Sequence, residues 1–273
     1  MRKSRVKGKW RRGEPACLTT AHLTDPSVYE MIGLMGFDGI WMDMEHHAYT
    51  VETAGNLMRA ARVGSTDCMV RPAKGEFMRM GRMLEAGAAG IMYPRCESPA
   101  EAREVVKWSK FAPLGARGFD GGNPDMPYCM IPMDQYVKQA NEETFVVVQL
   151  EDKNAVEHAY EIASVEGVDA ILLGPADFTV LNGIPGQFNH PLVQEATKKV
   201  AAAAKAAGKE WGRPAGTIDD IKRFMDMGSR FILHGCDLVY IKSGWEKMQK
   251  DLSALGFTFD NRIDQGGQSY LTK

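Results

Sequence analysis

The chain lacks the features that mark membrane proteins and disulfide-rich proteins. Its 273 residues contain no apolar run of about 18 residues, so no membrane-spanning helix is predicted. It has only five cysteines, an odd number, scattered without a C-x-x-C pair or other metal-binding spacing. This usage is typical of a reducing, cytoplasmic setting, and we expect the cysteines to be small buried hydrophobic residues.

The chain also lacks a strong net charge. The balance of 33 basic against 35 acidic residues gives −2 at pH 7, which predicts no polyanionic partner. One local excess exists, because residues 1–12 carry seven Lys and Arg residues. Such a run is typical of a nucleic-acid-binding arm or a targeting peptide. No apolar segment or cleavage site follows it, so we expect a solvated, partly helical arm over residues 1–13, with no nucleic-acid or membrane partner.

Strand-like runs alternate with amphipathic helical patterns along the whole chain. Eight such units over about 250 residues predict an α/β protein with a TIM (β/α)8 barrel. The predicted strands are 16–23, 38–45, 67–73, 90–96, 145–151, 169–177, 209–215 and 230–236. A doubly wound sheet is the main alternative, but no G-x-G-x-x-G follows the first strand.

We therefore predict a single barrel domain over residues 1–273, with an extended C-terminal helix and a tail over 256–273. The longest irregular stretch, 112–133, exceeds a plain connector, and we expect it to line the functional site.

Two acidic residues end consecutive predicted strands. Glu151 and Asp177 are separated by one helix-sized segment, so they belong to one βαβ unit. Neighbouring parallel strands lie about 4.8 Å apart, which lets two carboxylates at the same end share one hard divalent cation. Each acid alone is more simply a helix N-cap. Together at one rim, they favour a metal site and hence an enzyme.

Other polar residues follow the remaining strands at the same rim. The second strand ends in Asp43, Glu45, His46 and His47, and Arg71, Arg95 and Gln149 end the third, fourth and fifth. At most one of the adjacent histidines can point inward. Arg71 alone could be a structural salt bridge. The other histidines, His22, His158, His190 and His234, have no second ligand residue at a metal-binding spacing, and we interpret them as structural. Cys236 and Asp237 are interpreted as a strand end and a helix cap.

Three motifs carry a family resemblance over about residues 14–250. They are D-x-E-H after the second strand, Q-x-E after the fifth and G-P-A-D after the sixth. With segments such as GFDGIWMDMEHHAYTVE and VEGVDAILLGPADFT, the chain resembles the HpcH/HpaI aldolase family of metal-dependent class II pyruvate aldolases. The resemblance implies a barrel of the phosphoenolpyruvate/pyruvate type.

The resemblance implies roles for individual residues. Glu151 and Asp177 would bind Mg²⁺, Mn²⁺ or Co²⁺, and His46 would be the general base. Arg71 would stabilise an enolate oxygen, and Asp43 and Glu45 would support the residues that touch the metal and substrate. The remaining implied site residues are Glu85, which would raise the basicity of the histidine, and Gln149, Gly174, Ala176 and Asp177, which would hold the 2-oxo acid. Arg95 departs from the family pattern and would recognise an acidic aldehyde or form a subunit salt bridge.

The implied reaction is reversible cleavage of a 4-hydroxy-2-oxo acid to pyruvate, or hydroxypyruvate, and an aldehyde. Decarboxylation of a 2-oxo acid, as in oxaloacetate decarboxylases and macrophomate-synthase-like relatives, is the alternative. A non-catalytic barrel is a third interpretation, and the set of acids, histidine and arginine argues against it. The resemblance also implies a homo-oligomer of dimers forming a hexamer, with the terminal helix exchanged between neighbours.

Overall fold

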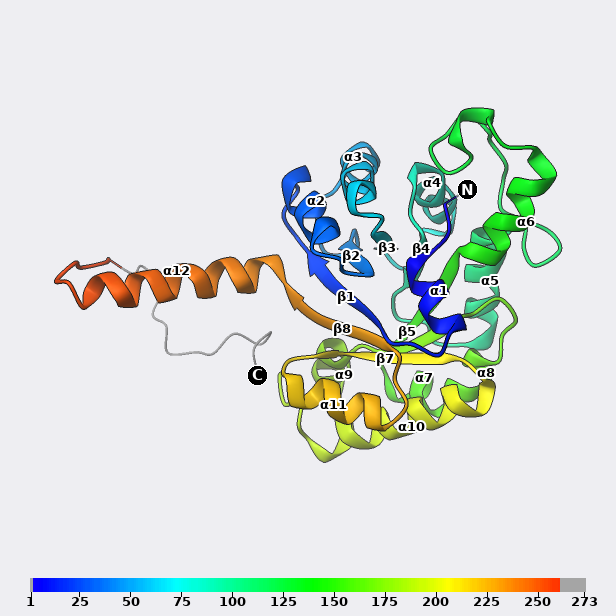
Figure 1. Cartoon of the computed structure of the whole chain (residues 1–273). Helices are drawn as coiled ribbons and strands as arrows, with labels where there is room; N and C mark the ends of the chain where they lie inside the picture. The colour runs from blue at the N-terminus through cyan, green and yellow to red at the C-terminus, as the bar shows by residue number, and fades with distance from the viewer. Residues whose placement is uncertain (1, 261–273) are drawn as a thin grey trace.

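The chain forms a closed barrel of eight parallel strands in sequence order (Figure 1). The computed structural model describes residues 2–260, so residues 261–273 of the predicted tail lie outside the described range. The strands are β1 (Ala16–Ala21), β2 (Gly39–Asp43), β3 (Asp67–Arg71), β4 (Gly90–Tyr93), β5 (Phe145–Leu150), β6 (Ala170–Leu173), β7 (Glu210–Ala215) and β8 (Phe231–Cys236). The predicted TIM barrel and all eight predicted strands are confirmed, with some strand ends shortened by one to four residues.

Twelve α-helices accompany the strands within residues 2–260, and most of them cover the outside of the barrel. They are α1 (Arg5–Arg11), α2 (Pro26–Leu34), α3 (Val51–Ala61), α4 (Phe77–Ala86), α5 (Pro99–Ser109), α6 (Met133–Glu143), α7 (Lys153–Glu157), α8 (Ala159–Ala163), α9 (Pro175–Leu181), α10 (Pro191–Ala207), α11 (Ile218–Asp226) and α12 (Asp237–Ser253). Local sequence sets many of their ends. Thr50 and Ser98 cap helix N-termini through side-chain oxygens, and Gly87 and Gly208 end helices in the left-handed conformation.

Side-chain alternation along the strands decides which residues reach the barrel mouth. On β5, Phe145 and Val147 pack inside the barrel, whereas Val146, Val148 and Leu150 pack against the helices. Because successive strand residues point to opposite faces, Gln149 and Glu151 continue the inward row. By the same alternation Arg71 follows the inward Met69 on β3. The polar site therefore stands on top of an apolar barrel interior.

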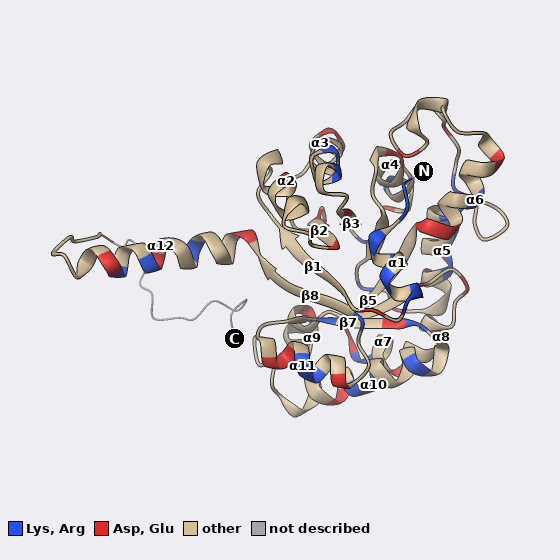
Figure 2. Ribbon diagram, viewed as in Figure 1, with Lys and Arg blue, Asp and Glu red and all other residues tan. Residues whose placement is uncertain are grey.

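The basic N-terminal segment closes the other end of the barrel. Val6 and Trp10 lie one helical turn apart on α1 and are buried, and the Trp10 ring packs edge-on against Phe145 and Phe231. Figure 2 shows the basic positions along the α1 ribbon. They pair with acids around that end, as Lys9 Nζ does with Asp38 Oδ2 at 2.7 Å. The expectation of a solvated arm is thus wrong. The two apolar residues, set among seven basic ones, make the segment a plug.

The long loop predicted to line the functional site lies at the wrong end for that role. It follows α5 and leads to β5, and in a (β/α)8 barrel such helix-to-strand connections lie at the N-terminal ends of the strands. Pro124 and Asp125 in this loop share a cavity of about 130 Å³ with Arg2 and Ser4 of the N-terminal segment. The prediction for residues 112–133 is therefore wrong, and the loop supports the closed end.

Helix α12 extends away from the barrel after β8 (Figure 1). It presents several large apolar side chains to solvent in the single chain, including Trp245 at 64% and Met248 at 52% exposure. Within residues 2–260, no helix combines the length and hydrophobicity that crossing a membrane requires.

Candidate active site

The centre of the barrel mouth is an ion pair between β2 and β3. Arg71 donates from Nε to Asp43 Oδ1 at 2.9 Å and from Nη2 to Oδ2 at 2.7 Å, and both residues are buried. The Nε atom also lies 3.3 Å from Oε2 of Glu45. Burial favours the neutral acid, but the hydrogen bonds and charge of Arg71 outweigh it and hold the pKa of Asp43 below its ordinary value. Asp43 and Glu45 therefore both lie against Arg71, and their supporting role in the site stays a prediction.

A hydrogen-bonded chain links this pair to the metal-ligand candidates. Arg71 Nη1 donates to Gln149 Oε1 at 3.3 Å, and Gln149 Nε2 donates to Glu151 Oε1 at 2.7 Å. The other carboxylate oxygen of Glu151 accepts the backbone N–H of Arg95 at 3.1 Å. Glu151 is therefore fixed in position by groups from β4 and β5. The Gln149 amide thus bonds the Arg71 guanidinium through its oxygen and the Glu151 carboxylate through its nitrogen.

Glu151 is buried beside a second acid. Its side chain is almost wholly buried, and burial, followed by the negative charge of Asp177, raises the pKa of Glu151 to about 8. Asp177 lies in the first turn of α9, directly after β6. A buried carboxylate that is destabilised by a neighbouring one is an environment that a cation relieves. The donors are hard oxygen atoms, so the pair fits Mg²⁺, Mn²⁺ or Co²⁺.

The backbone at Gly174 approaches this acid closely. A β-carbon at position 174 would lie 2.2 Å from Glu151 Oε1 and 2.6 Å from Gln149 Nε2. These separations are far below van der Waals contact, so a side chain here would displace one of the two groups. The glycine of G-P-A-D is therefore required by the space that Glu151 and Gln149 occupy.

Gly174→Ala is expected to lower the affinity for Mn²⁺ by roughly 10- to 100-fold, because it displaces a ligand candidate and its supporting amide. Calorimetric titration of the chelator-stripped protein measures this. Gly118→Ala is the matched control, since a β-carbon there meets no atom within 4 Å. Unchanged Mn²⁺ affinity in Gly174→Ala would contradict a metal at Glu151.

The two adjacent histidines have different surroundings. The His46 side chain is 57% exposed, and its Nε2 lies 3.6 Å from Glu45 Oε2. His47 is less exposed and lies between other rings, stacked on Tyr49 and edge-on to His22 at a centroid distance of 4.7 Å. Burial and the charge of His22 lower the pKa of His47. His46 is thus the more exposed of the two, and its role as the base stays a prediction.

Arg95 contributes its backbone and its charge at the rim. It has a positive φ of 45°, a conformation that costs a non-glycine residue energy and recurs at functional sites. In this conformation its N–H reaches Glu151, while its exposed guanidinium lies 3.9 Å from Glu45. Its side chain is thus free to meet a second molecule.

Glu85 does not join this group within one chain. It lies in the last turn of α4, which leads into β4, and hence at the closed end of the barrel. Burial raises its pKa, and the charges that act on it belong to Arg117, Asp120 and Asp125 of the long loop and to Arg82 of α4. No hydrogen bond or ion pair between Glu85 and His46 occurs among residues 2–260. Its implied role toward the histidine stays a prediction.

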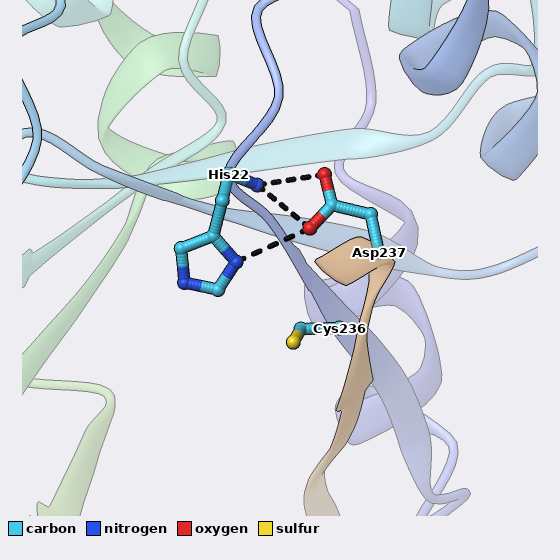
Figure 3. Close-up of side chains that lie close together, drawn as sticks. All are labelled: His22, Cys236 and Asp237. Carbon is cyan, nitrogen blue, oxygen red and sulfur yellow. Dashed lines mark hydrogen bonds and ion pairs between the residues drawn. The ribbon is translucent and has the colours of Figure 1, made fainter. Parts of the chain in front are cut away.

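A cluster that the sequence did not single out lies where β1 and β8 meet. His22 follows β1, and its Nδ1 lies 3.2 Å from Oδ1 of Asp237, which follows β8. Burial lowers the pKa of His22, but hydrogen bonds to Asp237 and Cys236 outweigh burial and raise this pKa to about 9. Cys236 lies beside both (Figure 3). The cluster could have been predicted from barrel closure, because closure makes the first and last strands neighbours.

Comparisons with known proteins agree on one group. The family model described as HpcH/HpaI aldolase/citrate lyase matches residues 21–243. A hydroxypyruvate/pyruvate aldolase from Delftia acidovorans is 35% identical over 237 residues, covering 86% of this chain and 87% of the relative. A 5-keto-4-deoxy-D-glucarate aldolase from Klebsiella pneumoniae is 31% identical over 226 residues, covering 83% and 88%. The solved HpcH/HpaI aldolase from Desulfitobacterium hafniense DCB-2 superposes with a TM-score of 0.87 at 30% identity, covering 93% and 98%.

Proposed function

The chain belongs to the HpcH/HpaI aldolase/citrate lyase family, and we propose that it is a divalent-metal-dependent aldolase. The proposed reaction is reversible cleavage of a 4-hydroxy-2-oxo acid into pyruvate, or hydroxypyruvate, and an aldehyde. One observation carries the proposal. The buried Glu151, paired with Asp177, is joined through Gln149 to the guanidinium of Arg71. Two kinds of positive charge, a bound cation and an arginine, can therefore meet one substrate.

The chemistry requires positive charge at one oxygen atom. Breaking the carbon–carbon bond leaves an electron pair on the α-carbon of pyruvate, which is tolerable only as an enolate. A divalent ion held by Glu151 and Asp177 would supply Lewis-acid stabilisation of that oxygen. Arg71 would add a fixed charge that the Asp43 carboxylate holds in place on two hydrogen bonds. This preorganisation is the main contribution of the protein.

Binding of the 2-oxo acid falls to the strand ends beside this charge. Gln149 already bridges Arg71 and Glu151, so it would orient the substrate oxygens from the centre of the site. Ala176, at the exposed start of α9, would offer its backbone N–H to the carboxylate. Arg95, after β4 at the same rim, would meet an acidic group on the aldehyde half.

His46 would move the proton. Cleavage requires a base that removes the 4-hydroxyl proton and returns it in condensation, which suits a group titrating near neutrality. We therefore expect His46→Asn to lower kcat by roughly 10²-fold or more. His47→Asn is the matched control and should change kcat less, because His47 packs between His22 and Tyr49. A larger loss in His47→Asn would reverse the roles.

The reaction class is tested by pyruvate release coupled to lactate dehydrogenase, with and without EDTA. Chelator-sensitive release from a 4-hydroxy-2-oxo acid is the expected outcome. Release from oxaloacetate alone would favour the decarboxylase, and no release from either substrate would favour a non-catalytic barrel. A screen of aldehydes with pyruvate and hydroxypyruvate as donors, across several divalent ions, then identifies the partner.

We further propose that the protein is a homo-oligomer, with dimers forming a hexamer. Helix α12 supports this, because an extended helix with exposed aromatic and apolar residues has no covering partner within residues 2–260. Trp245→Glu is expected to lower the mass in sedimentation velocity, and Lys250→Glu on the same helix should not. An unchanged mass in Trp245→Glu would count against exchange of this helix.

A further inference from the structure

Three different donor atoms converge at the seam that closes the barrel. One nitrogen of His22, the sulfur of Cys236 and a carboxylate oxygen of Asp237 all lie within 4.8 Å of one another. Cys236 and Asp237 are buried, and His22 is largely so. Figure 3 shows the His22 ring and backbone nitrogen directed at Asp237, with Cys236 beside them.

A β-bulge brings the cysteine to this place. Leu18 of β1 pairs with Leu233 of β8, but Thr20 pairs with Cys236, so β8 carries one extra residue. Gly235 lies within this bulge and has a φ of 75°. A β-carbon at this position would lie 2.2 Å from the Tyr240 hydroxyl. The strand end is therefore built to a local shape that turns Cys236 toward β1.

The carboxylate is held in place by three backbone groups. The N–H groups of His22, Leu23 and Leu238 donate to Asp237 at 2.8 to 3.0 Å. They make four hydrogen bonds to the two oxygens, and the fifth, with His22 Nδ1, is the only one from a side chain among residues 2–260. Supporting hydrogen bonds of this kind typically orient metal-ligating carboxylates. The carboxylate is therefore held in a fixed position beside the His22 ring and the sulfur of Cys236.

We propose that His22, Cys236 and Asp237 form a second cation site, for a borderline-soft divalent ion such as Zn²⁺. The set of one nitrogen, one sulfur and one oxygen donor is typical of zinc, whereas the all-oxygen pair at Glu151 and Asp177 is typical of harder ions. Zinc bonds of about 2.0–2.3 Å place tetrahedral donors roughly 3.3–3.8 Å apart, so small side-chain movements close the site. Binding releases the thiol proton and the proton between Nδ1 and Oδ1.

The proposed site is separate from the active site but adjacent to the same mouth. It lies on β1 and β8, across the barrel from β5, which carries Glu151. The His47 ring packs edge-on against His22, and His47 Nε2 lies 3.8 Å from Asp43 Oδ2. An ion at His22 would therefore be linked to the Asp43–Arg71 ion pair through two contacts, His22 with His47 and His47 with Asp43. The inference does not depend on the proposed aldol reaction.

Cobalt is the probe, because Co²⁺ bound to a thiolate gives an intense near-ultraviolet charge-transfer band and Co²⁺ bound to oxygen donors does not. The full chain is stripped with EDTA, kept reduced with a phosphine and titrated with Co²⁺. Because the oxygen site also takes up Co²⁺, we expect the band to saturate by two equivalents per chain in the unmodified protein, by one equivalent in Glu151→Gln, and to decay when Zn²⁺ is added. Glu151→Gln, which alters only the oxygen site, should retain the band.

Cys236→Ser should abolish the band, and Cys96→Ser, a buried cysteine at the same rim, should leave it unchanged. His22→Gln should weaken Co²⁺ binding at least about tenfold, because one of three ligands is lost. No band in the unmodified protein would overturn the proposal without reliance on any variant. A band that survives in Cys236→Ser and disappears in Cys96→Ser would overturn it as well.

Discussion

Glu151→Gln is expected to lower the rate of metal-dependent cleavage by about 10³-fold or more, while the protein stays folded. Gln keeps the size of the side chain but removes the charge that would hold the cation, and Lewis-acid stabilisation is worth several kcal/mol in such reactions. Initial rates across a Mn²⁺ titration measure the loss. Glu161→Gln, an exposed glutamate on α8, is the control for the loss of one negative charge.

The same substitution should change how stability depends on pH. Burial and the charge of Asp177 raise the pKa of Glu151 to about 8 in the folded protein, from an ordinary value of 4.5. Between these values the folded state binds more protons than the unfolded state, so the free energy of unfolding falls as pH rises. Chelator-treated protein should lose Tm across this window, and Mn²⁺ should restore it. In Glu151→Gln that contribution should vanish; an unchanged profile would argue against the pair.

Arg71→Ala is expected to cost on the order of 3 kcal/mol in kcat/KM, a loss of roughly 10²-fold. The guanidinium would stabilise charge that develops only as the carbon–carbon bond breaks, so most of the loss should appear in kcat. Arg71→Lys should recover part of it, because an ammonium keeps the charge but not the two-point contact with Asp43. Steady-state kinetics at saturating metal separate the two parameters.

Arg71→Ala also leaves Asp43 buried without its partner, which by itself can destabilise a protein by about 3–5 kcal/mol. The double variant Asp43→Asn with Arg71→Met removes both charges and serves as the control for folding. If this stable double variant turned over at a near-normal rate, the role of Arg71 at the enolate oxygen would be wrong.

The barrel and much of its mouth could be predicted because two periodic patterns carry them. Alternation along β5 places Gln149 and Glu151 on one inward row, and strand neighbours bring Arg71 to Asp43 at register-paired positions. These relations join residues close together along the chain or on consecutive strands. Both kinds can be predicted from the periodicity and order of the strands in the sequence.

The remaining features depend on contacts between distant segments. Barrel closure sets His22 against Asp237, 215 residues away, and a bulge decides that Cys236 joins them. Trp10 reads as one residue in a basic run until Phe231 is seen beneath it. The segment 112–133 suggested a site because it is a long loop. It follows a helix, α5, and therefore lies at the N-terminal ends of the strands, which its length alone does not indicate.

The plug formed by α1 has a consequence for biosynthesis. Trp10 is translated before every strand of the barrel, yet one of its two aromatic partners, Phe231, belongs to the last strand, β8. Helix α1 therefore cannot complete its packing until β8 has been translated. Until then its tryptophan and valine stay uncovered on the nascent chain, where a chaperone that recognises apolar side chains within basic segments would find them.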